Sequence, residues 1–217
     1  MTSPDLTCWT LIRGAAGGDA VARERFARVY LPVVTAYLAA RWRGRPADDA
    51  VQDVFVECFR AGGLLEKADP DRGGFRAFLL AAVRNVARRH ESRPHRGQPQ
   101  PILPDLPADD TGPEQAFDRA WARSLLKEAA RAQEEAATSE PARRRVQLLR
   151  LRFHDGLPIR DIAALWGVDA AKLHHEHATA RDEFRAALRR VVAFHHPGAS
   201  TADIDRACAE LLSLLGG

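Results

Sequence analysis

Apolar residues recur along the chain at intervals of three and four, the spacing that gathers side chains on one face of an α-helix. The pattern is clearest over 48–60 and in the segment that begins at Phe75. No segment shows the alternation of apolar and polar residues that is typical of a β-strand. The pattern therefore predicts an all-α protein. The apolar positions are Val51, Val54, Phe55, Cys58 and Phe59 in the first segment and Phe75, Phe78, Leu79, Ala82, Val83 and Val86 in the second.

Glycine, proline and helix-capping residues indicate where further helices begin and end. Pro32 has no backbone N–H to donate, so we expect it to divide a helix over 19–30 from another over 33–42. Farther along, Gly167 lies in a tight turn between a helix that begins at Pro158 and a long helix over 170–192. Two helices joined in this way are typical of a helix-turn-helix. We expect further helices over 5–16, 113–137 and 143–154.

Prolines are concentrated between residues 93 and 112. Each proline removes a backbone donor and restricts the residue before it, so this segment cannot be helical. We therefore expect two helical domains, over 1–92 and 113–196, joined by a partly extended linker over 93–112. The remaining residues, 197–217, form a C-terminal tail.

The net charge of +3 over 217 residues hides an uneven distribution along the chain. Residues 72–96 hold seven arginines against one glutamate, for a net charge of +6. Residues 98–118 carry a net charge of −5, and residues 143–190 one of +5. Two basic segments separated by an acidic one predict two surfaces that face a polyanion.

Several classes of protein are disfavoured by the same sequence. No apolar stretch approaches the ~20 residues that a membrane span needs, and the N-terminus lacks the pattern of a signal peptide. Three widely spaced cysteines favour a reducing cytoplasm over a disulfide framework. The histidines near residues 174 and 195 lack the neighbouring cysteines and the spacing of a zinc site. We therefore expect a cytoplasmic protein with no metal, no cofactor and, since no catalytic motif is present, no enzymatic activity.

Two parts of the chain resemble the extracytoplasmic-function sigma factors, which are small members of the bacterial sigma-seventy family. The resemblance covers roughly residues 5–92 and 115–192, in the order that the family has. The first part is similar to region two of the family through Asp48-Asp49-Ala50-Val51-Gln52-Asp53-Val54-Phe55, Phe75-Arg76-Ala77-Phe78-Leu79 and Val83-Arg84-Asn85. The second resembles the region-four helix-turn-helix through Leu157-Pro158-Ile159-Arg160-Asp161-Ile162-Ala163-Ala164-Leu165-Trp166-Gly167-Val168 and Ala178-Thr179-Ala180-Arg181.

The resemblance implies a factor that directs core RNA polymerase to promoters and helps to open them. Its partners would be promoter DNA and the beta-prime clamp and beta flap of the polymerase, and an anti-sigma factor could be a further one. Asp49, Gln52 and Asp53 match the positions that dock on the clamp. Phosphates of the minus-ten element would be held by the arginines of the first basic segment, with the loop 69–74 and Asn85 as candidates for the pocket of an unstacked base. The arginines are Arg72, Arg76, Arg84, Arg88 and Arg89.

The start of the expected recognition helix departs from the family pattern. Candidate contacts to the minus-thirty-five element are Lys172, His174, His175, Glu176 and Arg181. Glu176 takes a place where a basic residue is common, and it could accept a hydrogen bond from a cytosine amino group or repel phosphate. Two alternatives stay open: a helix-turn-helix regulator that binds duplex DNA without polymerase, and a sigma-like interaction protein that no longer reads promoters, for which this unusual helix is the main support.

The C-terminal tail predicts an amphipathic helix over 201–215. Ser200 or Thr201 is a suitable N-cap, and a helix this short needs a surface for its apolar face to cover. The tail would either pack on the second domain as a stabilising lid or restrain a basic DNA-facing surface. The apolar positions are Ile204, Ala207, Cys208, Leu211, Leu212 and Leu215.

Overall fold

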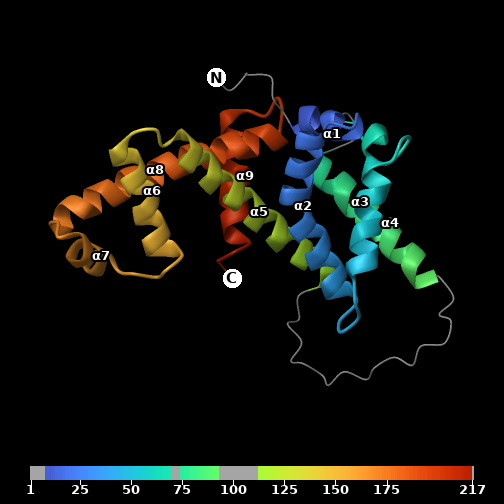
Figure 1. Cartoon of the computed structure of the whole chain (residues 1–217), viewed down its shortest axis with the longest axis horizontal. Helices are drawn as coiled ribbons and strands as arrows, with labels where there is room; N and C mark the ends of the chain where they lie inside the picture. Colours follow the sequence, from blue (N-terminus) through green and yellow to red (C-terminus); the bar gives the residue numbers. More distant parts are fainter. Residues whose placement is uncertain (1–7, 70–73, 93–111, 217) are drawn as a thin grey trace. The chain divides into compact units, whose positions relative to one another are not determined.

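The computed structural model describes residues 8–69, 74–92 and 112–216, and all regular structure in these residues is helical (Figure 1). The all-α prediction is confirmed. The helices are α1 (Cys8–Ala16), α2 (Ala20–Arg41), α3 (Asp48–Phe59), the 3₁₀ turn η1 (Leu65–Lys67), α4 (Phe75–Ser92), α5 (Pro113–Ala136), α6 (Glu140–Phe153), α7 (Ile159–Trp166), α8 (Ala170–His195) and α9 (Thr201–Ser213).

The chain divides into two compact units whose boundaries differ from those expected. The first unit comprises Met1–Ser124 and Ala193–Gly217, and the second comprises Leu125–Val192. Helices α5 and α8 therefore each contribute residues to both units, although the sequence assigned both of them to the second domain. Of the expected linker over 93–112, all but Gly112 lies outside the described residues.

The core of the first unit is built around Phe26, which is fully buried in the first part of α2. Its ring packs against Tyr30 of the same helix and Phe75 at the start of α4, with centroids 4.6 and 5.8 Å away. Phe55 and Phe59 of α3 approach the same ring from 6.1 and 5.4 Å. Large rings give this core much of its stabilisation because each of them removes a large apolar area from water. The cluster fixes α2, α3 and α4 against one another.

Helix α2 runs without a break through Pro32, so the expected division of this segment into two helices is wrong. A proline inside a helix costs about 3 kcal/mol, because one hydrogen bond is lost and the ring crowds the preceding turn. Each large apolar side chain that is fully buried stabilises the folded state by about 1.5–3 kcal/mol. The side chains that the continuous helix buries on both sides of the proline outweigh its cost; they include Tyr30, Val33, Val34 and Tyr37.

We expect Pro32→Ala to raise the melting temperature. Position 32 is exposed, so alanine would restore the missing backbone hydrogen bond without disturbing the core. The gain should reach about 1–3 kcal/mol in denaturant unfolding. Thr35→Ala, at an exposed position one turn later, is the matched control and should change stability by only about 0.5 kcal/mol. A lower stability of Pro32→Ala than of the parent protein would contradict this account.

In the second unit, α7 and the first part of α8 are joined by a tight turn where the sequence predicts a helix-turn-helix. Gly167 ends α7 in the left-handed conformation, with a φ of 62°, which a residue without a Cβ adopts readily. Asp169 then caps α8, since its carboxylate accepts a hydrogen bond of 2.9 Å from the Lys172 backbone N–H. The core beneath the turn consists of Leu148, Ile159, Ile162, Ala163 and Leu173.

Two large apolar side chains near this core are exposed to solvent. Leu165 of α7 is 66% exposed, and Phe153 of α6 is 67% exposed. The buried position of α6 is Leu148.

The tail forms the expected helix, α9, with Ser200 as its N-cap. Its residues are grouped with the first unit, whereas one of the two arrangements expected for the tail was packing on the second domain. Leu211 is buried, whereas Leu212, which was expected on the same face, is 50% exposed.

Candidate nucleic-acid interface

Helix α4 separates its apolar and basic side chains onto different faces. Phe75, Leu79 and Val83 are fully or almost fully buried against the rest of the first unit. Burial of this stripe turns the remaining positions of the helix towards solvent, because side chains three and four residues apart share a face. The outward positions are Arg76, Asn85, Arg88 and Arg89, with Arg84 half-buried. The predicted basic face of α4 is therefore present, while Arg72 and residues 70–73 of the expected pocket lie outside the described residues.

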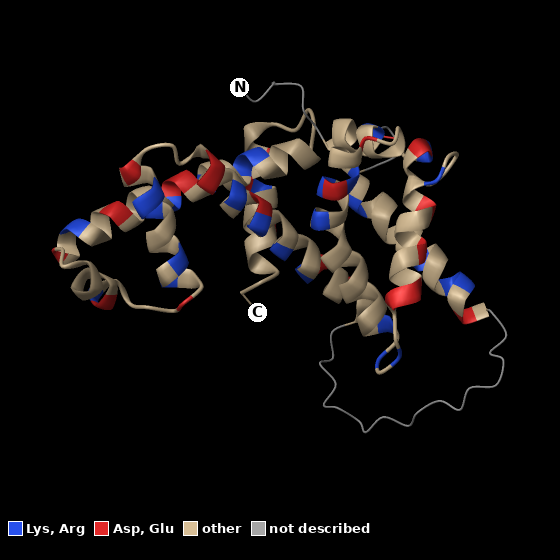
Figure 2. Ribbon diagram, viewed as in Figure 1, with Lys and Arg blue, Asp and Glu red and all other residues tan. Residues whose placement is uncertain are grey.

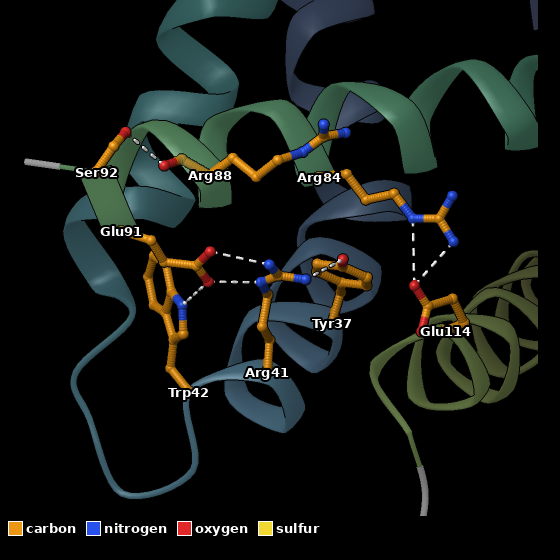
Figure 3. A network of polar contacts seen from close by, with 8 residues as sticks. All are labelled: Tyr37, Arg41, Trp42, Arg84, Arg88, Glu91, Ser92 and Glu114. Carbon is orange, nitrogen blue, oxygen red and sulfur yellow. Dashed lines mark hydrogen bonds and ion pairs between the residues drawn. The ribbon is translucent and has the colours of Figure 1, made fainter.

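Two of these arginines form ion pairs with the first part of α5. Arg84 donates to Glu114 Oε1 from Nε and Nη2, at 3.2 and 2.8 Å (Figure 3). Arg76 donates to Asp118, one turn further along α5. The hydrogen bonds from Arg84 lower the pKa of Glu114, so this carboxylate stays charged at neutral pH. Both carboxylates belong to the acidic stretch of the sequence, but their partners lie 30 and 42 residues away.

The other two arginines differ in their surroundings. Arg89 donates to Glu57 of α3 at 3.2 Å, and Glu57 also pairs with Arg60 at 2.9 Å. Arg88 is exposed, and its guanidinium forms no ion pair with any described residue. Figure 3 shows its side chain extending beside Arg84. Arg88 is thus the arginine of this face that is readiest to meet an anion.

A network at the end of α4 ties this helix to α2. Arg41 donates to both oxygens of Glu91, at 2.6 and 2.9 Å, and Trp42 Nε1 donates to Glu91 Oε1 at 2.8 Å (Figure 3). Arg41 also donates to the Tyr37 hydroxyl at 3.3 Å. The hydrogen bonds from Arg41, and then that from Trp42, lower the pKa of Glu91 to about 2. Sequence reasoning missed this network because its members come from helices that are distant along the chain.

The α3 face that the resemblance assigns to polymerase docking is exposed only in part. Asp49 and Gln52 are exposed, as expected for a docking surface. Asp53 instead accepts a hydrogen bond of 2.8 Å from His90 Nε2 of α4. Figure 2 shows the acidic residues of α3 and the basic residues of α4 along the ribbon. The hydrogen bond between Asp53 and His90 joins these two helices directly.

In the second unit, most of the candidate recognition residues are exposed on α8. Lys172, His174, His175 and Arg181 are open to solvent. Glu176 is the exception, because its carboxylate lies 3.3 Å from Arg144 Nε of α6. The guanidinium of Arg144 also lies over the Trp166 ring, 4.8 Å from its centroid. The ion pair between Glu176 and Arg144 links α8 to α6.

His177 on the same helix is half-buried. Burial lowers the pKa of its imidazole, and the nearby cations Arg181 and Arg152 add to the effect. His177 is therefore neutral at neutral pH.

Other kinds of site find no support in the part of the chain that is described. The thiols of Cys8 and Cys58 are buried, and burial raises their pKa to about 11 and about 12, so both stay protonated. Among residues 8–69, 74–92 and 112–216, no three His, Cys, Asp or Glu side chains come together as ligands for a metal ion. None of the helices described here combines the length and the apolar character needed to cross a membrane.

A comparison with models of protein families gives a match that lies in the first unit. Residues 26–96, which include most of α2 and all of α3 and α4, match the family model of sigma-70 region 2. The match supports membership of the sigma-70 family and covers the helices that carry Asp49, Gln52, Arg84 and Arg88. Searches of the curated proteins and of the solved structures found no match.

We expect Glu91→Gln to destabilise the protein at neutral pH but not in acid. The pKa of Glu91 is about 2 in the folded state, against an ordinary 4.5. Its contribution is therefore complete above about pH 4.5 and disappears as the pH falls towards 2. Since Glu91 is partly exposed, the loss at pH 7 should be about 1 kcal/mol in denaturant unfolding.

Glu135→Gln is the control for this measurement. It removes an exposed carboxylate that pairs with Arg131 within one helix, and it should cost at most about 0.5 kcal/mol. Equal losses in the two variants, or a loss for Glu91→Gln that persists undiminished at about pH 3, would contradict the role of the network.

Proposed function

We propose that this chain is an RNA polymerase sigma factor of the extracytoplasmic-function type, which directs core polymerase to promoters and helps to open them. The observation that carries the proposal is the match of residues 26–96 to sigma-70 region 2. The exposed basic face of α4, within the matched segment, agrees with a role in holding promoter DNA.

In this proposal α3 binds the polymerase and α4 binds the promoter DNA. Asp49 and Gln52 of α3 contact the polymerase, and Asp53 supports them by binding His90. Arg84, Arg88, Arg76 and Arg89 of α4 contact phosphates of the minus-ten element, and Asn85 lies among them. Arginine suits this task because its planar guanidinium can donate two parallel hydrogen bonds to one phosphate.

The helix-turn-helix of the second unit is the proposed reader of the minus-thirty-five element. Lys172, His174, His175 and Arg181 are exposed on α8. A helix that follows a tight turn in this way can enter the major groove with its first residues at the base edges. Because Glu176 is paired with Arg144, it need not repel the phosphates. This removes part of the argument for a sigma-like protein that has lost promoter recognition.

The second candidate function is a helix-turn-helix regulator that binds duplex DNA without polymerase. It is favoured by the exposed residues of α8 alone, and it gives the sigma-70 region 2 segment no role. Transcription from a library of genomic promoters by core polymerase, with and without the protein, distinguishes the two. A sigma factor makes initiation dependent on the added protein, whereas such a regulator leaves core polymerase unable to initiate at specific sites.

We expect Asp49→Arg to abolish co-purification with core polymerase. The substitution puts a cation where the proposed docking surface has a carboxylate, and the fold stays intact because position 49 is exposed. Glu24→Arg makes the same change at an exposed position of α2 outside this surface and should leave binding unchanged. Undiminished co-purification of Asp49→Arg, with unaltered helicity, would remove Asp49 from the interface.

We expect Arg88→Ala to weaken binding to all promoter sequences alike. Loss of one phosphate contact should reduce the slope of log K against log salt by about 0.7–0.9. Arg206→Ala, on α9, removes an exposed arginine outside the α4 face and should keep the slope of the parent protein. If Arg88→Ala also kept that slope, Arg88 would not contact a phosphate.

A further inference from the structure

The basic face of α4 is already occupied in part by carboxylates of the same chain. Glu114 and Asp118 lie one helical turn apart on α5 and bind Arg84 and Arg76, which lie two turns apart on α4. We propose that residues 113–124 compete with DNA for the basic face of α4. Their two carboxylates occupy Arg84 and Arg76 until phosphates of DNA displace them. This inference rests on the proposed function, because it concerns the regulation of the same DNA-binding surface.

The competition follows from the chemistry of the guanidinium group. Glu114 Oε1 accepts from both Nε and Nη2 of Arg84, which is the edge of the guanidinium that a phosphate would also use. Carboxylate and phosphate therefore exclude each other at that edge. Asp118 likewise accepts from Nη2 of Arg76, so a phosphate that takes this N–H displaces the carboxylate. DNA that binds these two arginines through the same N–H groups has to break both ion pairs.

Apolar contacts, and not the charges alone, hold this part of α5 in place. Phe117 is fully buried and packs on Tyr37 of α2, with ring centroids 6.4 Å apart. Trp121 is also buried and stacks on Tyr30 at 5.5 Å. All four residues belong to the first unit. Since Glu114, Phe117, Asp118 and Trp121 follow helical spacing, one side of α5 supplies both the anchor and the carboxylates.

A second segment of the first unit meets the same anchor. His195, at the end of α8, is buried with its Nε2 atom 3.0 Å from the Tyr30 hydroxyl. Its ring lies edge-on to Trp121, 5.4 Å between centroids. The aromatic side chains of α2 thus hold the first part of α5 together with the end of α8.

The two ion pairs are exposed enough to be reversible. The side chains of Arg84 and Glu114 are 41% and 47% exposed, and those of Arg76 and Asp118 are 45% and 24% exposed. Pairs of this kind are weak and are screened by salt. Ion pairs of this strength lower the affinity for DNA by a modest factor and do not prevent binding. Arg88, which carries no such carboxylate, offers the first contact to an approaching phosphate.

The test replaces both carboxylates by their neutral amides in the full-length chain. We expect the double variant Glu114→Gln, Asp118→Asn to bind a labelled single-stranded oligonucleotide of mixed sequence about three- to tenfold more tightly at low salt. The slope of log K against log salt should steepen by up to about 1.4, because two more phosphates are neutralised on a single strand. Binding is measured by fluorescence anisotropy, and circular dichroism verifies the fold.

The matched control is Glu134→Gln, Glu135→Gln. It alters the net charge by the same amount on the same helix, but in the part of α5 that belongs to the second unit. Equal tightening in the two double variants would mean a general electrostatic effect and would overturn the proposal. Unchanged or weaker binding of the Glu114→Gln, Asp118→Asn variant would also overturn it.

A third variant shows whether Glu114 acts through Arg84. In an Arg84→Ala background, Glu114→Gln should no longer tighten binding, and an undiminished gain there would overturn the proposed link.

Transcription with core polymerase separates this proposal from the proposed function. If the parent protein fails to support initiation while the oligonucleotide measurements follow the expected pattern, the sigma-factor assignment fails and the competition stands. If initiation succeeds without that pattern, the competition alone fails.

Discussion

The packing of Phe26 and Tyr30 against the rings around them is the interaction on which the rest of the first unit depends. These two residues of α2 bring together α3 through Phe59, α4 through Phe75 and α5 through Trp121. A core of large rings tolerates little displacement, because close-packed side chains cannot shift without opening voids. The faces of α3 and α4 that point away from this core are therefore held in fixed positions.

The charges on those outward faces are paired mainly within the protein. Asp53 binds His90, Glu57 binds Arg89, and Glu91 binds Arg41. Such pairs add little to stability where they are exposed, but each fixes the direction of a long side chain. Asp49, Gln52 and Arg88 are exposed, and their side chains have no ion pair or hydrogen bond with another described residue. The first unit thus combines pairs that hold its helices together with a few groups that can meet a partner.

The ion pairs between α4 and α5 use the same arginines that would bind DNA in the proposed function. Arg84 and Arg76 have the chemistry to hold phosphates, and in this structure the same chemistry holds Glu114 and Asp118. Their exposure makes the pairs weak, so a strand with one negative charge per nucleotide can compete with them. A surface for DNA and a contact within the chain are therefore alternative uses of the same arginines.

The sequence by itself determined the helical class, most helix ends and the outward face of α4, because helical periodicity and capping are local properties of the chain. It also indicated the sigma-70 resemblance through Asp49, Gln52 and Arg84, and the match of residues 26–96 to sigma-70 region 2 agrees with that resemblance. Only the tertiary structure decided that α2 continues through Pro32, since this depends on the burial of Tyr30 and Tyr37 against other helices. It alone paired Arg84 with Glu114 and Glu176 with Arg144, because an ion pair between distant residues depends on how helices pack, which no local pattern encodes.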